Sequence, residues 1–174
     1  AKSRYAVEAR GSANQTACGP GTYSAGAGAS ECTDCAEGSY QDAPEKPSCK
    51  LATAGYFVAA AGASAETACA AGNFSSAGAT TCTRCPPGAF TATGGQGSCT
   101  SASAGYSVEA RGSSNQTECG PGTYSAGAGA TECAACAEGS YQPEGGKSSC
   151  LLANSGFFVG AEGASAETPC PTGR

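Results

Sequence analysis

The spacing of the cysteines restricts the fold of this chain more than any other feature of its sequence. The thirteen cysteines are separated by gaps of 14, 3, 14 and 20 residues, and this set of gaps occurs three times, with one gap of 13 in place of 14. A fixed spacing of this kind indicates a tandem repeat of short structural units. The cysteines are Cys18, Cys32, Cys35, Cys49, Cys69, Cys82, Cys85, Cys99, Cys119, Cys133, Cys136, Cys150 and Cys170.

A finer period appears when each gap of 20 residues is divided into 3, 14 and 3. The chain then divides into units of 17 residues, one of them of 16, which we call coils. The third residue after each coil start is Gly in every coil except the first, which has Arg4, and every aromatic residue follows one or two places later. A second Gly stands ten residues after the start of most coils, and Glu45 interrupts this series.

These periods define the domain organisation that we expect. A cysteine-free coil at residues 1–17 precedes three repeats, and residues 170–174 begin a further one. Each repeat consists of two coils with cysteines and one without. The repeats span 18–68, 69–118 and 119–169, and their coils are 18–34, 35–51, 52–68, 69–84, 85–101, 102–118, 119–135, 136–152 and 153–169.

The composition excludes a conventional apolar core. The chain has four Val and three Leu, and it lacks Ile, Met and Trp. Ordering costs roughly 1.5 kcal/mol per residue, which burial of so few large side chains cannot offset. Thirteen cysteines and 27 glycines are instead typical of a disulfide scaffold, which persists where thiols are oxidised, outside the cell. We therefore expect an extracellular, small disulfide-rich fold of irregular segments and short β-hairpins, with little or no helix. Because one coil cannot fold alone, we expect an elongated rod or solenoid of stacked coils.

Charge and hydropathy exclude two classes of partner. The net charge is −5, only 13% of the residues are charged, and no basic run occurs, so nucleic acid is not an expected partner. No apolar run is long enough to span a bilayer, so we expect no membrane insertion in this segment. Since the sequence begins without Met or a signal peptide, we expect it to be part of a longer chain.

Spacing alone leaves the pairing of four cysteines per repeat open. In the cysteine-free coils both cysteine positions are replaced together, as in the pair Ala52 and Glu66, which favours a disulfide within each coil. The crossed pattern, with Cys18 bonded to Cys35 and Cys32 to Cys49, remains an alternative. Cys170 begins a coil, and its expected partner lies after Arg174. In the cysteine-free coils we expect packing of the valines, Val7, Val58, Val108 and Val159, to take the place of the disulfide.

Near-verbatim copies lie 101 residues apart, as with VEARGS at Val7 and at Val108. Lengthening by duplication suits an extended protein more than a single active site. The silk-like stretch YSAGAGASEC, Tyr23 to Cys32, aligns with segments of unrelated composition and with one that is a residue shorter, so we interpret it as a turn in which Gly28 supplies the backbone angle.

The pattern CGPGTYSAGAGASECTDCAEGSY, Cys18 to Tyr40, resembles the GCC2/GCC3 and ephrin-receptor-like cysteine-rich repeats. It is also similar to the first half-module of tumour-necrosis-factor-receptor repeats, in which a CxxGxY start is bonded to a cysteine about fourteen residues later. The resemblance covers nearly the whole chain and implies extended rods in receptor ectodomains or in large, sometimes fibrous, surface proteins. The cysteine-free third coil departs from that pattern, so a receptor-type connectivity cannot be transferred as a whole.

Several kinds of chemistry lack the residues that they need, so we expect no catalytic residue, no metal site and no cofactor. The three CxxC pairs lie about 50 residues apart rather than at the spacing of a zinc ribbon, and no His completes a site. Without His the common nucleophilic triads cannot form. Because Asp34 and Asp42 are the only aspartates and the glutamates are dispersed, a calcium loop is not expected and we interpret the carboxylates as solvated surface.

Three N-glycosylation sequons are present, at Asn14, Asn73 and Asn115. We expect covalent glycans at these residues in an extracellular setting. The alternative is an unmodified Asn in a turn.

Two functions remain open on these grounds. The leading hypothesis is a structural component of an extracellular filament, stalk or cell-surface appendage, which associates with itself or with co-assembling extracellular chains. The alternative is a rigid ectodomain of a receptor or adhesin that binds a protein or glycan ligand. Neither hypothesis requires catalytic activity, and we do not expect the chain to be an enzyme.

Overall fold

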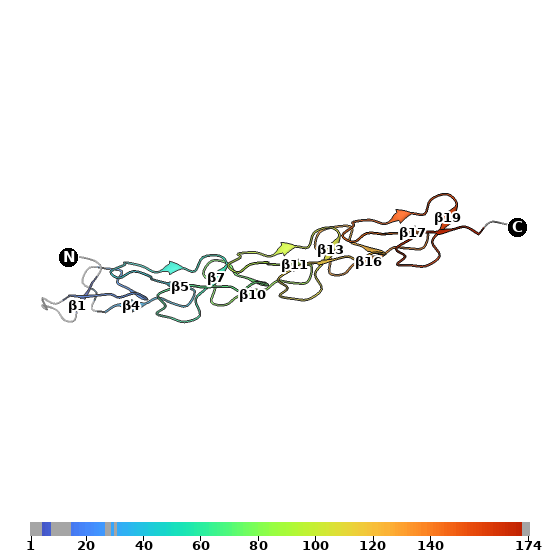
Figure 1. Ribbon diagram of the computed structural model, residues 1–174. Helices are drawn as coiled ribbons and strands as arrows, with labels where there is room; N and C mark the ends of the chain where they lie inside the picture. Colours follow the sequence, from blue (N-terminus) through green and yellow to red (C-terminus); the bar gives the residue numbers. More distant parts are fainter. Residues whose placement is uncertain (1–4, 8–14, 27–28, 30, 172–174) are drawn as a thin grey trace. The chain divides into compact units, whose positions relative to one another are not determined.

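The computed structural model describes residues 5–7, 15–26, 29 and 31–171 (Figure 1). These residues form short strands joined by turns and irregular segments, and they contain no helix. The strands are β1 (Tyr5–Val7), β2 (Gln15–Ala17), β3 (Thr22–Tyr23), β4 (Thr33–Asp34), β5 (Ser39–Tyr40), β6 (Lys50–Leu51), β7 (Tyr56–Phe57), β8 (Thr67–Ala68), β9 (Asn73–Phe74), β10 (Thr83–Arg84), β11 (Ala89–Phe90), β12 (Thr100–Ser101), β13 (Tyr106–Ser107), β14 (Thr117–Glu118), β15 (Thr123–Tyr124), β16 (Ala134–Ala135), β17 (Ser140–Tyr141), β18 (Leu151–Leu152), β19 (Phe157–Phe158) and β20 (Thr168–Pro169).

The strands pair two by two in chain order, so each coil with two described strands holds one small hairpin. The pairing is antiparallel, as in β13 and β14, where Tyr106 lies opposite Glu118 and Ser107 opposite Thr117. Strands of two residues are too short to be stable as isolated hairpins, so their stability must come from neighbouring coils. The predicted fold class, a disulfide-rich repeat of short hairpins, is confirmed by this architecture.

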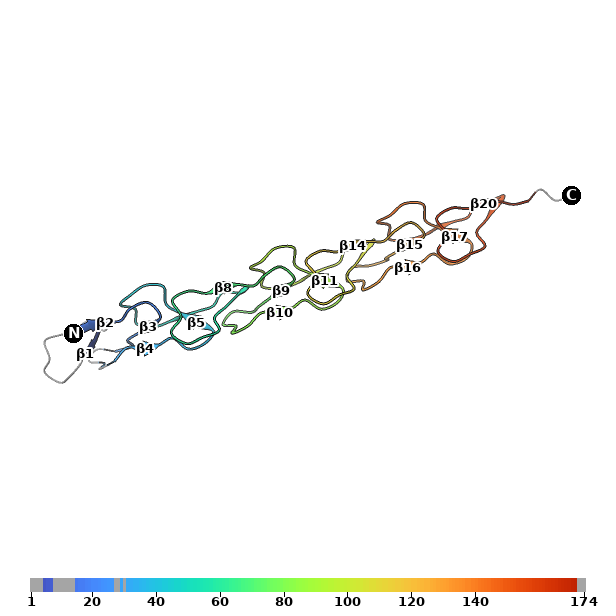
Figure 2. The ribbon, with the colours of Figure 1, turned by 60° about the horizontal axis from the view of Figure 1, so that its bottom comes forward.

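The chain divides into two compact units, residues 1–83 with 93–98, and residues 84–92 with 99–174. Within the second unit the hairpins β13–β14, β15–β16 and β17–β18 follow one another, as Figure 1 shows. Figure 2 shows the same succession in the first unit, from β3 through β5 to β8. In each unit, therefore, neighbours in sequence are also neighbours in space.

Each coil begins with a tight turn that the sequence signals through its glycine. In coil 102–118 the Tyr106 N–H donates to the Ser103 carbonyl at 3.0 Å, and Gly105 has a φ of +85°. A positive φ at the third position of such a turn is the requirement of a type II turn, which favours Gly there. The turn leads directly into the first strand of the hairpin, which carries the aromatic residue.

Within each unit, three backbone hydrogen bonds join successive coils of the described residues. Between coils 102–118 and 119–135, the Gly105 N–H donates to the Ser125 carbonyl (2.9 Å), the Val108 N–H to the Ala130 carbonyl (3.0 Å), and the Gly129 N–H to the Ala102 carbonyl (2.8 Å). The same three bonds recur in every successive pair of coils from 18–34 to 69–84 and from 85–101 to 153–169. Because only main-chain atoms take part, coils with and without cysteines stack in the same way.

Two side chains per coil form the narrow core. One is the first residue of the coil, which is at most 1% exposed where it is a disulfide cysteine and fully buried at Ala52 and Ala102. The other is the seventh residue, which is buried in every described coil whether it is polar or apolar: Ser24, Gln41, Val58, Ser75, Thr91, Val108, Ser125, Gln142 and Val159. The backbone ladder, rather than a large apolar cluster, therefore determines how the coils pack.

Coils two apart also approach each other closely. A Cβ added at Gly105 would lie against the carbonyl of Gly146, two coils further along the chain, whereas one added at Gly139 would meet no atom within 4 Å. The recurring glycine is therefore needed for space as well as for its backbone angle.

The described copy of the silk-like stretch, Tyr124 to Cys133, is an ordinary connection between β15 and β16. Gly28 lies outside the described residues, but its counterpart in the copy 101 residues later, Gly129, has a φ of +82°. The 16-residue coil absorbs its deletion in this same loop, since Gly78 retains a φ of +74° and its N–H still donates to the Ala52 carbonyl at 2.8 Å. Loop length varies while the hydrogen bond to the preceding coil is kept.

In the 174-residue chain, Gly105→Ala should destabilise the fold more than Gly139→Ala does, because residues 170–174 are too few to form the coil two places after that of Gly139. Both place a Cβ at a positive φ, which costs about 1–2 kcal/mol, but only Gly105→Ala also forces a collision with the Gly146 carbonyl. Chemical denaturation of the two variants tests this difference. Equal losses of stability would contradict the close approach of alternate coils.

Conversely, Glu45→Gly should stabilise the chain by about 1 kcal/mol. Glu45 has a φ of +58°, in a place where the other described coils have Gly, and its N–H donates to the Cys18 carbonyl at 2.8 Å. Glu37→Gly is the matched control, because Glu37 has no positive φ and the added chain freedom should destabilise the protein. Thermal unfolding of both variants should show shifts of opposite sign.

Candidate functional site

The disulfides close individual coils. Each of the six bonds joins the first residue of a coil to a residue 13 or 14 positions later, with Cα atoms 5.5 to 5.8 Å apart. The structure therefore has the within-coil pairs rather than the crossed ones. They are Cys18–Cys32, Cys35–Cys49, Cys69–Cys82, Cys85–Cys99, Cys119–Cys133 and Cys136–Cys150.

These bonds also occupy both sulfurs of every CxxC pair. Cys170 is exposed and has no disulfide partner within the described residues, and the expectation that its partner lies after Arg174 stays a prediction. In the described part of the chain no three His, Cys, Asp or Glu residues are grouped so that they could hold a metal ion.

The cysteine-free coils are closed by a polar side chain. In coil 52–68 the Glu66 carboxylate accepts hydrogen bonds from the Thr53 N–H (2.6 Å) and the Thr53 hydroxyl (2.9 Å). Glu66 stands at the position of the second cysteine, and Thr53 follows the position of the first. The carboxylate thus bridges the two ends of the coil, as the disulfide does elsewhere. We call this arrangement the polar clasp.

The polar clasp recurs in the other two cysteine-free coils of the three repeats. The Gln116 Oε1 accepts a hydrogen bond from the Ser103 N–H at 2.7 Å. The Glu167 carboxylate accepts hydrogen bonds from the N–H and the side-chain amide of Asn154, at 2.7 and 2.9 Å. A glutamate or glutamine therefore replaces the second cysteine with conserved geometry.

This geometry corrects one expectation from the sequence. Glu66 and Glu167 are not merely solvated carboxylates, because they accept backbone hydrogen bonds across their coils. The valines Val58, Val108 and Val159 are buried at a core position that is polar in the coils with disulfides, and the expectation that their packing takes the place of the disulfide stays a prediction. The signal was present in the sequence, since only Cys, Glu or Gln stands at this position of the coils.

In coils 35–51 and 136–152, a glutamine side chain forms hydrogen bonds to the backbone of its own loop. The buried Gln41 side chain donates to the Ser48 carbonyl (2.7 Å) and accepts from the Ala43 N–H (3.2 Å), and Gln142 makes the corresponding bonds in the duplicated loop. Across the first loop, Lys50 forms an ion pair with Asp42 at 2.7 Å. The hydrogen bond between them lowers the pKa of Asp42 and raises the pKa of Lys50. Both groups are exposed, so the pair orients the loop surface rather than contributing to a core.

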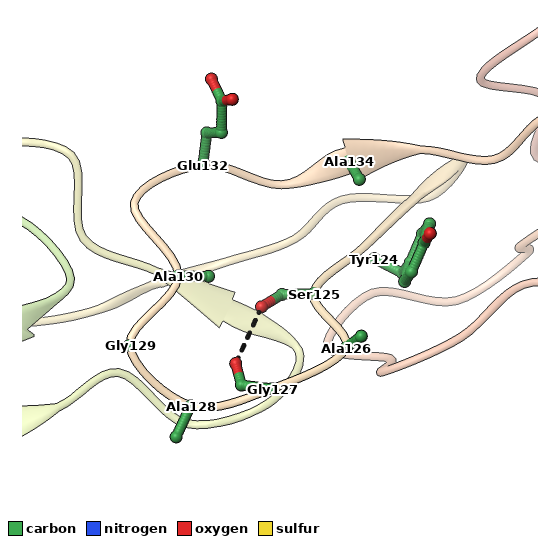
Figure 3. Close-up of a pocket in the computed structure, with 9 residues that line it drawn as sticks. All are labelled: Tyr124, Ser125, Ala126, Gly127, Ala128, Gly129, Ala130, Glu132 and Ala134. Carbon is green, nitrogen blue, oxygen red and sulfur yellow. Dashed lines mark hydrogen bonds between the residues drawn. The ribbon is translucent and has the colours of Figure 1, made fainter.

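The surface hollows show little convergent chemistry. One hollow, with a volume of about 330 Å³, lies within a single loop between Tyr124 and Ala134 (Figure 3). Its lining is mainly Ala and Gly, and the Glu132 carboxylate points away from the Tyr124 ring. Ser125 donates its hydroxyl to the Gly127 carbonyl at 3.3 Å, so this polar group is engaged within the loop. A nucleophile paired with a base is absent from the residues that line this hollow.

The sequons lie in different surroundings. Asn14 lies outside the described residues. Asn73 is half-buried in β9, and Asn115 is exposed in the loop before β14.

Introducing cysteines at Ala52 and Glu66 should replace the polar clasp by a seventh disulfide. The two positions correspond to those that are bonded in the other coils, and closing a loop of about 15 residues contributes roughly 3 kcal/mol. Peptide mapping without reduction, together with thermal unfolding, tests this expectation. Two free thiols in the folded double variant would contradict the equivalence of the two clasps.

Removal of the polar clasp by Glu66→Ala should destabilise the protein by about 1 kcal/mol, the net value of a hydrogen bond of this kind. The matched control is Glu37→Ala, since Glu37 is exposed and its side chain has no hydrogen bond in the structure. Denaturant titration should show no shift for the control. A loss of stability as large as that of Glu66→Ala would contradict the clasp.

Comparison with known proteins agrees with the repeated geometry. The family model described as tyrosine-protein kinase ephrin type A/B receptor-like matches three consecutive segments, residues 21–69, 72–119 and 122–173. Each match begins at the glycine three residues after the start of a 51- or 50-residue repeat. No curated protein matches the chain. Repeats of this family are typically extracellular modules without catalytic activity, and the chain belongs to the ephrin-receptor-like family of cysteine-rich repeats.

Proposed function

We propose that this chain is a structural segment of an extracellular filament, stalk or cell-surface appendage. The observation that carries the proposal is the recurrence of the same three main-chain hydrogen bonds between successive coils. A contact made only by backbone atoms can be repeated without a particular side chain, so coils can be added by duplication. The near-verbatim copies 101 residues apart are consistent with growth of this kind.

The closure of the coils supports the same proposal. Six coils are held by disulfides, which fits an oxidising, extracellular setting. Among the described coils, three use the polar clasp, which needs no oxidation. The function then requires mechanical continuity rather than a reacting group. The expected partner is another copy of the chain or a co-assembling extracellular chain.

A second candidate is the rigid ectodomain of a receptor or adhesin. The ephrin-receptor-like family favours it, as do the braced loops at residues 41–50 and 142–151. These loops carry exposed ion pairs, Lys50 with Asp42 and Lys147 with Glu144, which a protein or glycan ligand could contact. On this reading a few coils bind a ligand and the others act as a spacer.

A membrane anchor is not part of either proposal for this segment. In the described residues there is no helix with the length and apolarity that a bilayer crossing needs.

Electron microscopy of the native material, with an antibody raised against this chain, distinguishes the two candidates. The structural function predicts label along filaments or stalks, without saturable binding of a soluble ligand. Discrete monomers that bind a protein or glycan with a measurable dissociation constant would overturn the structural proposal and support the receptor or adhesin.

A further inference from the structure

We infer that Asn115 is a glycan acceptor and that Asn73, in spite of its sequon, is an unmodified residue that caps a turn. The inference goes beyond the proposed function, because a filament and a receptor ectodomain would both carry it. It requires only that the chain passes through a secretory pathway, where N-glycosylation occurs.

Asn115 is presented to solvent by the clasp residue that follows it. The Gln116 side chain turns into the coil, since its Oε1 accepts the Ser103 N–H at 2.7 Å. Asn115 itself is exposed, and so is Thr117, the hydroxyl residue of the sequon, which begins β14. The structure shows no hydrogen bond from the Asn115 side-chain amide, so a sugar at that nitrogen displaces no contact of the fold.

The environment of Asn73 is different. Its Nδ2 donates hydrogen bonds to the carbonyls of Ala70 (3.2 Å) and Ala71 (3.1 Å) in the turn that begins its coil. Ser75, the hydroxyl residue of this sequon, is only 3% exposed, and its Oγ donates to the Tyr56 carbonyl at 2.8 Å. The whole sequon is thus part of the packed side of the hairpin.

Equivalent residues of other coils perform the same capping with a hydroxyl group. The Thr22 Oγ1 donates to the Gly19 carbonyl at 2.9 Å, and the Thr123 Oγ1 donates to the Gly120 carbonyl at 2.7 Å. Asn73 stands at the same place in its coil as Thr22 and Thr123. The hydrogen bonds of its side-chain amide to the turn therefore account for an Asn at this position.

The chemistry of the modification is incompatible with this cap. In N-glycosylation the Asn Nδ2 forms a bond to the anomeric carbon of a lipid-pyrophosphate-linked oligosaccharide, the lipid pyrophosphate leaves, and the nitrogen loses one proton to a base of the transferase. The product amide keeps a single N–H. Asn73 could then no longer donate to both carbonyls, and the sugar would have to lie beside Ala70 and Ala71.

The Asn115 sequon lies in a cysteine-free coil whose clasp residue is a glutamine. Asn115 immediately precedes Gln116, and in the copy 101 residues earlier Asn14, which lies outside the described residues, precedes Gln15. Where the clasp residue is Glu66 or Glu167, the preceding residue is Ala. The sequons of the cysteine-free coils thus stand before a glutamine and alternate, along the chain, with cysteine-free coils that have a glutamate and no sequon.

Site-specific mass spectrometry of the 174-residue chain, secreted from eukaryotic cells, tests the inference. Enzymatic deglycosylation in heavy-oxygen water marks each formerly glycosylated Asn as labelled Asp. We expect label at Asn115 and none at Asn73 in the folded, monodisperse fraction. Label at Asn73 in that fraction, or an unlabelled Asn115, would overturn it.

Three variants separate modification from folding. Asn115→Gln should remove the glycan and leave the melting temperature of the enzymatically deglycosylated protein unchanged. Asn73→Thr restores a hydroxyl cap of the kind seen at Thr22, so its glycan pattern and melting temperature should match the parent chain. Asn73→Ala should lower the melting temperature without changing the glycan mass. A reduced glycan mass in Asn73→Thr would contradict the capping role.

Discussion

The main-chain hydrogen bonds between successive coils are the interaction on which the structure of each unit depends. A hairpin with two-residue strands has too little buried surface to persist alone, and the chain lacks the branched aliphatic residues that would supply a larger core. Stacking adds three hydrogen bonds between successive coils within each unit and buries the seventh residue of the described coils, together with the first residue of those from 18–34 to 136–152. Stability is therefore shared between neighbours, as in other repeat proteins, and a defect in one coil also affects the coils on either side of it.

Closure of the individual coil is a separate requirement, and the chain meets it in two chemically different ways. A disulfide constrains the unfolded chain, whereas the Glu66 clasp satisfies an N–H and a hydroxyl of Thr53 in the folded coil alone. The two are geometrically equivalent because they link the same two ends of the coil. They differ in what breaks them, since reductants cleave the disulfides and do not act on the hydrogen bonds of the polar clasp.

The polar side chains of the surface also form hydrogen bonds within their own coils. Side chains in the turns and loops bond back to their own backbone, as with Asn73 and Gln41, so the groups that a ligand would use are already engaged. Exposed polar groups are left at loop tips and on the second strands of the hairpins, as in β4 and β10, and Asn115 is exposed beside a polar clasp. This distribution is suited to covalent decoration and to contacts along an assembly more than to an enclosed binding site.

The cysteine and glycine periods determined the hairpin character and the family, because a turn with a positive φ favours Gly, and a disulfide that closes a coil requires two cysteines, at fixed positions of the sequence. Pairing within coils was favoured by the joint loss of both cysteines, but the crossed pattern stayed possible until the coil ends were placed in space. Three features were decided by the tertiary structure alone: the hydrogen-bond ladder, the partners of the Glu66 carboxylate, and the different surroundings of the sequons at Asn73 and Asn115. The physical reason is that main-chain donors and acceptors are the same in every residue, and a Glu or Asn side chain is compatible with solvent as well as with a cap. Only the approach of groups from separate turns of the chain determines which partner each of them has.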